Sequence, residues 1–143
     1  MIRAVLDANI YVSALIRPQG PPGRILRLLV ENRAFQLIGS NVILDEVRRS
    51  VKYPRVRRYL TLRPEEIDRW MIALALIAEP TEGRLKLRAV EKDPEDDKYL
   101  AAALEGHAEY VVSGDSDLLN MREYRGISIV TAREFLRLLE ETI

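Results

Sequence analysis

The 143-residue sequence contains no cysteine and only one histidine. The absence of cysteine excludes a disulfide framework and thiolate metal sites, and a reducing cytoplasm is the expected compartment. A single histidine, His107, excludes zinc sites that are built from several imidazoles. The longest apolar runs, 71–78 and 2–6, are too short to span a bilayer. Because no charged segment followed by an apolar core opens the chain, we expect neither a signal peptide nor a membrane partner.

Short apolar runs alternate with helical patterns along the whole chain. We predict strands over 2–6, 35–38, 87–90, 110–112 and 127–130. The predicted helices cover 9–16, 24–31, a segment that begins at Ser40 or Asn41, 56–59, 64–78, 96–105, 118–121 and 132–141, with a loop over 17–23. This alternation predicts one domain over 1–143 with a three-layer α/β/α fold and a mainly parallel central sheet.

Four acidic positions, Asp7, Glu46, Asp97 and Asp115, are distributed along this predicted fold, and we refer to them as the four acids. Three of the four are predicted to lie at the ends of buried strands. Ligands of open parallel sheets bind outside the carboxyl ends of the strands, so these carboxylates are expected to converge. Carboxylates that repel one another are stabilised by a cation, and their hard oxygen atoms suit Mg²⁺ or Mn²⁺. The pattern therefore predicts a divalent-metal site for phosphoryl transfer.

Each of these positions also has a structural explanation. Asp7 or Asn9 can cap the following helix, and the acids of the 93–97 run, including Asp93, suit a helix N-terminus. Periodicity does not decide whether Asp45 or Glu46 faces the site, and Glu46 is spaced for an intrahelical pair with Arg49. The turn over 113–117 can be an ordinary Asx turn, although its exposed N–H groups can also hold an anion.

The basic residues are also unevenly placed, although the net charge is zero. Between positions 48 and 63 there are seven basic residues and no acidic one, and 18 of the 22 basic residues are arginine. Arginine recognises phosphate with a planar fork, whereas a solvated helix face or an ion-pair network explains the same composition. We predict that Arg48, Arg49 and Lys52 contact nucleic-acid phosphates, and Arg24 is a weaker candidate.

The motifs together resemble the PIN-domain ribonucleases, in particular small proteins similar to VapC-type toxins of prokaryotic toxin–antitoxin pairs. The resemblance rests on Val5-Leu-Asp7-Ala-Asn-Ile-Tyr-Val-Ser13, Glu46-Val-Arg48, Asp97-Lys-Tyr-Leu-Ala-Ala102 and Val112-Ser-Gly-Asp115-Ser-Asp117. The family often has threonine where this chain has Ser113. The resemblance implies a PIN-like sheet, Mg²⁺- or Mn²⁺-dependent cleavage of RNA, a cognate antitoxin and a homodimer.

On this basis the four acids are predicted to hold one or two metal ions, with Asp117 as an outer ligand. Asn9 and Ser113 are predicted to orient ligands or water around them. The helix over 64–78 carries more apolar surface than one covering helix needs, so we expect part of a dimer interface there unless Trp70 belongs to the core.

Two alternative functions use the same residues. A haloacid-dehalogenase-type phosphatase also begins with a strand and an aspartate, but it needs a second aspartate where this chain has Asn9. A non-catalytic module that binds RNA or protein could keep the fold, but clustered acids without a metal would destabilise it.

Overall fold

The computed structural model of this protein describes residues 1–90 and 94–142. Its centre is a sheet with the strand order β3-β2-β1-β4-β6-β5, in which only the β5–β6 pair is antiparallel. The described strands are β1 (Arg3–Leu6), β2 (Gln36–Gly39), β3 (Glu79–Pro80), β4 (Tyr110–Val112), β5 (Glu123–Tyr124) and β6 (Ile127–Val130).

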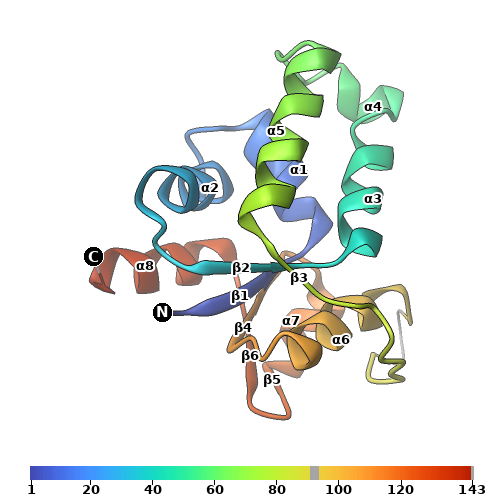
Figure 1. Ribbon diagram of the computed structural model, residues 1–143, viewed down its shortest axis with the longest axis vertical. Coiled ribbons are helices and arrows are strands. Elements are labelled where there is room, and N and C mark those ends of the chain that lie inside the picture. Colours follow the sequence, from blue (N-terminus) through green and yellow to red (C-terminus); the bar gives the residue numbers. More distant parts are fainter. Residues whose placement is uncertain (91–93, 143) are drawn as a thin grey trace.

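Helices cover both faces of this sheet, so the predicted three-layer α/β/α fold is confirmed (Figure 1). Helix α6 contacts β1, β2 and β4, and α7 contacts β6, whereas α1 packs against α2 and α3 on the other face. The described helices are α1 (Ala8–Ile16), α2 (Pro21–Asn32), α3 (Asn41–Ser50), α4 (Pro54–Arg57), α5 (Pro64–Ile77), α6 (Asp97–Glu105), α7 (Ser116–Met121) and α8 (Ala132–Thr142), and a single 3₁₀ turn covers Pro94–Asp96.

The buried parts of the central strands are continuous apolar runs, because both of their faces are covered there. Val5 of β1 is fully buried and lies between Ile38 of β2 and Val111 of β4 in the parallel register. On the α8 side, the rings of Phe35 and Phe135 meet edge to face with their centroids 5.1 Å apart. The core therefore continues on both sides of the sheet.

Three chain segments leave the carboxyl edge of this sheet next to one another. The Asp7 N–H donates to the carbonyl oxygen of Val112 at 2.9 Å, so the pairing of β1 with β4 continues to the first residue after β1. After β2, the Ser40 hydroxyl accepts a hydrogen bond from the Ile43 N–H and caps α3. The sequence therefore places the starts of α1, α3 and α7 at one edge, as expected for parallel strands that follow one another in the sheet.

Two local predictions are wrong. Residues 87–90 form no strand; the N–H groups of Ala89 and Val90 donate instead to the side chain of Asp97, and the edge strand is β3. Helix α2 begins at Pro21 rather than at Arg24, because proline is favoured in the first turn, where its missing N–H has no intrahelical partner. Residues 21–23, which were predicted as part of the loop over 17–23, therefore belong to α2.

Tyr11 of α1 has a buried hydroxyl. Its side chain is fully buried, its ring meets the edge of the Trp70 ring at 6.4 Å, and its hydroxyl has no hydrogen-bond partner among the described residues. Burial raises the pKa of the Tyr11 hydroxyl, which therefore stays neutral. Trp70 is half-buried and belongs partly to the core.

Candidate functional site

Asp7 stands at the centre of the candidate site, directly after β1. Its side chain is buried, its Oδ1 accepts a hydrogen bond from the Asn9 N–H at 2.8 Å, and its Oδ2 accepts one from the Ser113 hydroxyl at 2.6 Å. Asp7 thus caps α1, as one of the structural explanations predicted. The Asn9 side chain itself is exposed at the start of the same helix.

Burial is the main reason why the pKa of the Asp7 carboxyl lies above its ordinary value of 3.8. The hydrogen bonds from Ser113 and Asn9 lower this pKa, and the negative charges of Glu46 and Asp115 raise it further. The structure therefore brings Asp7, Glu46 and Asp115 near enough for their charges to interact, although they come from different elements.

Glu46 lies on the side of α3 that faces α6, whereas Asp45 points into solvent. The Asp45 side chain is 56% exposed and pairs with Arg48 at 2.8 Å. The Glu46 side chain is 29% exposed, and its Oε2 accepts a hydrogen bond from Lys98 Nζ at 3.0 Å. Of the two neighbouring acids that periodicity left open, Glu46 is the one that faces Asp7.

Tyr99 connects Glu46 to the start of α1. Its hydroxyl donates to Oε1 of Glu46 and accepts a hydrogen bond from the Ala8 N–H at 3.3 Å. Burial and the nearby charges of Asp7 and Glu46 raise the pKa of Tyr99, so the hydroxyl keeps the proton that it donates. Tyr99 and Lys98 were not predicted as site residues, because their partners are more than 50 positions away in the chain.

Asp97 is buried at the start of α6, one residue before Lys98. Its Oδ1 accepts hydrogen bonds from the N–H groups of Ala89 and Val90, at 3.0 and 2.8 Å. The carboxylate therefore anchors the segment that precedes α6. Asp93, named with Asp97 as part of the acidic run, lies outside the described residues.

The turn after β4 links Asp7 to Asp115. Ser113 is fully buried. Its hydroxyl donates a hydrogen bond to Asp7 and accepts one from the Asp115 N–H at 2.9 Å. Asp115 caps α7, because its Oδ1 accepts hydrogen bonds from the N–H groups of Asp117 and Leu118 at 2.8 and 3.3 Å. Asp117 is half-buried in the first turn of α7.

The donor set suits a divalent cation, since several carboxylates meet at one sheet edge and repel one another there. As the side chains stand, no three acidic or histidine residues within 1–90 and 94–142 are arranged to hold one ion between them. The ammonium group of Lys98 instead lies against Glu46 and supplies the positive charge. The residues therefore fit a metal by their chemistry, and Glu46 would have to release Lys98 to bind it.

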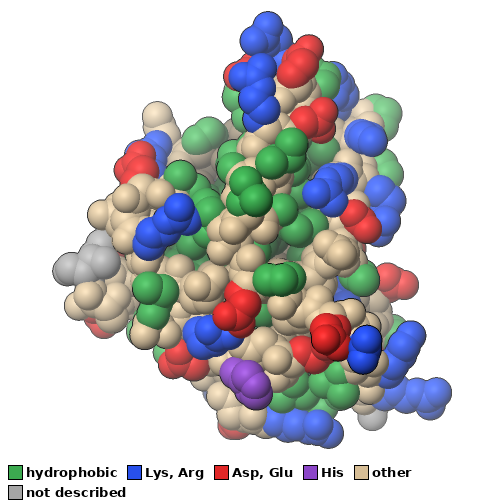
Figure 2. Space-filling view, viewed as in Figure 1, with side chains coloured by type: hydrophobic (Ala, Val, Ile, Leu, Met, Phe, Trp, Pro, Cys, Tyr) green, Lys and Arg blue, Asp and Glu red, His purple; other side chains and the backbone are tan. Residues whose placement is uncertain are grey.

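The basic segment after Glu46 is partly used in internal contacts. Arg48 pairs with Asp45, while Arg49 and Lys52 are exposed. Arg24 pairs with Glu140 of α8 at 2.9 Å, away from this segment. Figure 2 shows basic side chains over the α3 and α4 side of the molecule.

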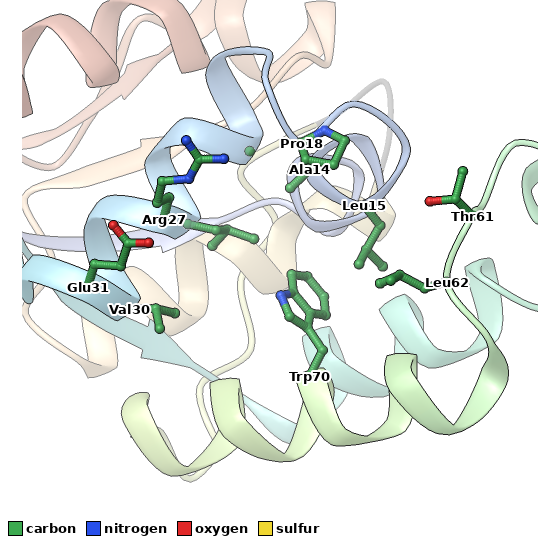
Figure 3. A pocket seen from close by; sticks show the side chains of 11 residues that line it. Ala14, Leu15, Pro18, Arg27, Val30, Glu31, Thr61, Leu62 and Trp70 are labelled. Atoms are coloured by element: carbon green, nitrogen blue, oxygen red, sulfur yellow. The ribbon is translucent and has the colours of Figure 1, made fainter.

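A cavity of about 330 Å³ lies between α1, α2 and α5 (Figure 3). Apolar side chains such as Leu15, Leu26 and Trp70 line it, and Arg27 and Glu31 stand at one side. None of the four acids lines this cavity. It is therefore separate from the carboxylate site. In addition, no described helix has both the length and the apolar character that crossing a membrane requires.

Comparison with known proteins agrees with the fold. An uncharacterized protein of Methanocaldococcus jannaschii is 28% identical over 150 residues, which cover 99% of this chain and 94% of that protein. A chain in the crystal structure of VapBC2 from Rickettsia felis, bound to a DNA fragment from their promoter, superposes with a TM-score of 0.55. That match has 16% identity and covers 91% of this chain and 98% of the other, so it concerns the fold alone.

The model of the PIN domain family matches residues 3–117, from the first strand to the last of the acidic residues named above. This range contains all four acids, Ser113 and both residues of α6 that contact Glu46. The resemblance seen in the motifs is therefore confirmed, and the chain belongs to the PIN domain family.

Proposed function

We propose that this protein is a divalent-metal-dependent endoribonuclease and the toxin component of a toxin–antitoxin pair. The observation that carries the proposal is the position of Asp7, Glu46 and Asp115 at one sheet edge, near enough for their charges to interact. Burial is the main cause of the raised pKa of Asp7, and the charges of Glu46 and Asp115 add to it. Charge clustering of this kind is unfavourable in a purely structural site and favourable when a cation is bound. Membership of the PIN domain family supports nuclease chemistry as the use of that cation.

In the proposed mechanism, the four acids hold Mg²⁺ or Mn²⁺, with Asp117 as an outer ligand. Such an ion, when bound, would supply Lewis acidity at the phosphoryl oxygen and would lower the pKa of the water that serves as nucleophile. Ser113 fixes the orientation of the Asp7 carboxylate through its 2.6 Å hydrogen bond. Asn9, exposed beside Asp7, orients water or the scissile phosphate from the solvent side.

We further propose that RNA leaves this site along α3 toward α4. Arg49 and Lys52 are the exposed phosphate contacts on this path, and Arg48 contributes less because Asp45 already pairs with it. Beyond them, the guanidinium groups of Arg55 and Arg58 lie over the exposed rings of Tyr53 and Tyr59. Arginine planes and aromatic rings are the groups on which unpaired bases stack.

The proposed partners are an antitoxin and a second copy of this chain. The similar fold in VapBC2 of Rickettsia felis supports an antitoxin, and a cytoplasmic location is consistent with a toxin that acts on RNA. For the homodimer, α5 has less free apolar surface than its sequence suggests, because Ile67, Met71 and Leu74 are buried in the core. The exposed large apolar residues of α5 are Ile72 and Leu76. Figure 2 shows hydrophobic side chains at the surface along α5.

A matched pair of substitutions on α3 tests the nuclease. Glu46→Gln removes a proposed ligand, whereas Asp45→Asn removes the neighbouring solvent-exposed carboxylate. Single-stranded RNA, with and without Mn²⁺, is incubated with both variants and with the unmodified protein. We expect Mn²⁺-dependent internal cleavage that Glu46→Gln lowers at least ~100-fold and that Asp45→Asn does not lower, because this change only releases Arg48 from its ion pair. Cleavage that survives chelation, or that both variants retain, would exclude the proposed site.

The alternatives predict other results in the same set of assays. A phosphatase would release phosphate from small phosphomonoesters, but Asn9 occupies the position of the required acid and has no proton to donate in that role. A binding module would retain RNA without cutting it, whether or not Mn²⁺ is present.

A further inference from the structure

Both oxygen atoms of Glu46 are already occupied by neighbouring residues of α6. Lys98 Nζ lies 3.0 Å from Oε2, and the Tyr99 hydroxyl donates to Oε1. The Lys98 side chain is only 17% exposed, which is low for a lysine on a protein of this size. Two adjacent residues of one helix therefore fix a carboxylate that comes from another helix.

Lys98 is the positive charge of the site. Within residues 1–90 and 94–142, no other lysine or arginine forms an ion pair with any of the four acids. Its ammonium group thus compensates the charge that Glu46 would otherwise add to that of Asp7 and Asp115. Any divalent ion that binds Glu46 enters a place that already holds a cation.

The two cations exclude each other at Oε2. A Mg²⁺ ion binds carboxylate oxygen at about 2.0–2.1 Å in a near-octahedral shell, and Mn²⁺ favours similar oxygen ligands. An ammonium group that stays 3.0 Å from the same oxygen would then stand within or beside that shell, where the positive charges repel. The hydroxyl of Tyr99 is neutral and occupies the other oxygen, so it is compatible with a bound ion.

The structure also provides a second partner for the displaced ammonium group. Glu95, one helical turn before Lys98, has its Oε2 3.8 Å from Nζ, and its side chain is 87% exposed. A change of rotamer would bring Nζ from Glu46 to Glu95 without movement of the backbone. Because Glu95 faces solvent, this second position leaves Oε2 of Glu46 open.

We propose that Lys98 is the resident counter-ion of the metal-free site and that the metal displaces it toward Glu95, while Tyr99 keeps Glu46 in place. This inference rests on the proposed metal-dependent function and adds a positioning residue that sets the metal affinity. Lys98 lowers that affinity, because its ammonium group competes with the ion. In return, it keeps the metal-free site folded and charge-balanced.

Mn²⁺ binding to purified variants tests this inference without an activity assay. Lys98→Met removes the competing charge and keeps the apolar stem, and Lys52→Met makes the same change at an exposed lysine of α3–α4. Calorimetric titration with Mn²⁺ gives the affinity, and thermal unfolding with and without Mn²⁺ gives the stability. We expect Lys98→Met to bind Mn²⁺ at least ~10-fold more tightly, to melt lower without metal, and to gain more in Tm when Mn²⁺ is added. Lys52→Met should match the unmodified protein.

Glu95→Gln provides an independent arm, because this side chain is 87% exposed and the change is close to isosteric. The loss of the second partner should weaken Mn²⁺ binding several-fold, opposite to the effect of Lys98→Met. If Lys98→Met fails to fold, this variant and Lys98→Gln still decide the question.

The outcomes separate this inference from the proposed function. A Mn²⁺ response in the unmodified protein that Lys98→Met leaves equal or makes weaker would overturn the role of Lys98 and leave the metal site intact. Mn²⁺ binding and a Mn²⁺-induced rise in Tm in Lys98→Met alone would support the role of Lys98 and refute metal dependence of the natural protein. No response in either protein would overturn both.

Discussion

Two tyrosines of this protein allow the same one-atom change to be tested in opposite environments. Tyr11 and Tyr99 are both almost completely buried, but the Tyr11 hydroxyl has no hydrogen-bond partner among the described residues. The Tyr99 hydroxyl donates to Glu46 and accepts from the Ala8 N–H. We predict that Tyr11→Phe stabilises the fold and that Tyr99→Phe destabilises it.

The magnitudes follow from the partners. A hydroxyl buried without a hydrogen bond destabilises a protein by roughly 1–3 kcal/mol, and the small void left by its oxygen offsets part of the gain. We therefore expect Tyr11→Phe to raise the free energy of unfolding by about 1 kcal/mol. A hydrogen bond to a charged group contributes roughly 1.5–3 kcal/mol, and water can replace part of it because Glu46 is 29% exposed. The expected loss for Tyr99→Phe is about 1–2 kcal/mol.

Equilibrium unfolding in urea measures this difference. The midpoint concentrations of the two variants should lie on opposite sides of that of the unmodified protein, with equal m-values. In thermal unfolding, the two should differ by about 6–12 °C in Tm. If both variants lose the same stability, the Tyr11 hydroxyl has a partner in solution, such as a buried water molecule, and the reasoning about its environment is wrong.

The remaining predictions concern pH, RNA and assembly. Because the pKa of Asp7 is raised above 3.8, the folded metal-free protein holds a proton that the unfolded chain releases, so its stability should fall as pH rises through that window. Asp7→Asn should remove this slope in urea titrations, and an unchanged slope would contradict the raised pKa. The variant Arg49→Ala/Lys52→Ala should flatten the salt dependence of RNA affinity by about 1.4 in log–log slope, whereas Arg133→Ala/Arg137→Ala on α8 should not; equal slopes would leave the α3 residues without a role. Light scattering should give a dimer that Ile72→Ser/Leu76→Ser converts to a monomer, and a mass of 16.4 kDa for the unmodified protein at high concentration would exclude it.

The sequence was sufficient for the elements that have strong local signals. The apolar runs before Asp7 and after Glu109 predicted β1 and β4, since strands buried on both faces are continuously apolar. The two-residue strand β3 could not be predicted, because it is exposed, contains Pro80 and exists only through its pairing with β2. The prediction of a strand over 87–90 was wrong for a related reason. The N–H groups of Ala89 and Val90 donate to the Asp97 carboxylate and not to a neighbouring strand.

The sequence could predict that Asp7, Glu46 and Asp115 lie near one another, but it could not predict that Lys98 lies beside Glu46. Asp7 and Asp115 follow strands, and that position is a local signal of the sequence. Lys98 and Tyr99 have no such signal, because their partner Glu46 lies 52 and 53 positions away, and only the packing of α6 against α3 brings them together. Periodicity on α3 was also insufficient, and the choice between Asp45 and Glu46 depended on which side of that helix α6 covers.

Three of the four acids have a structural role that does not depend on the proposed metal. Asp7 and Asp115 cap the first turns of α1 and α7, and Asp97 binds two N–H groups ahead of α6. A relative without the proposed catalytic activity would still be under selection to keep these three, since each replacement would loosen a helix start or a chain segment. Their presence in a relative is therefore poor evidence that the relative is active. Glu46 caps no helix, so its presence or loss in a relative says more about whether that relative is active.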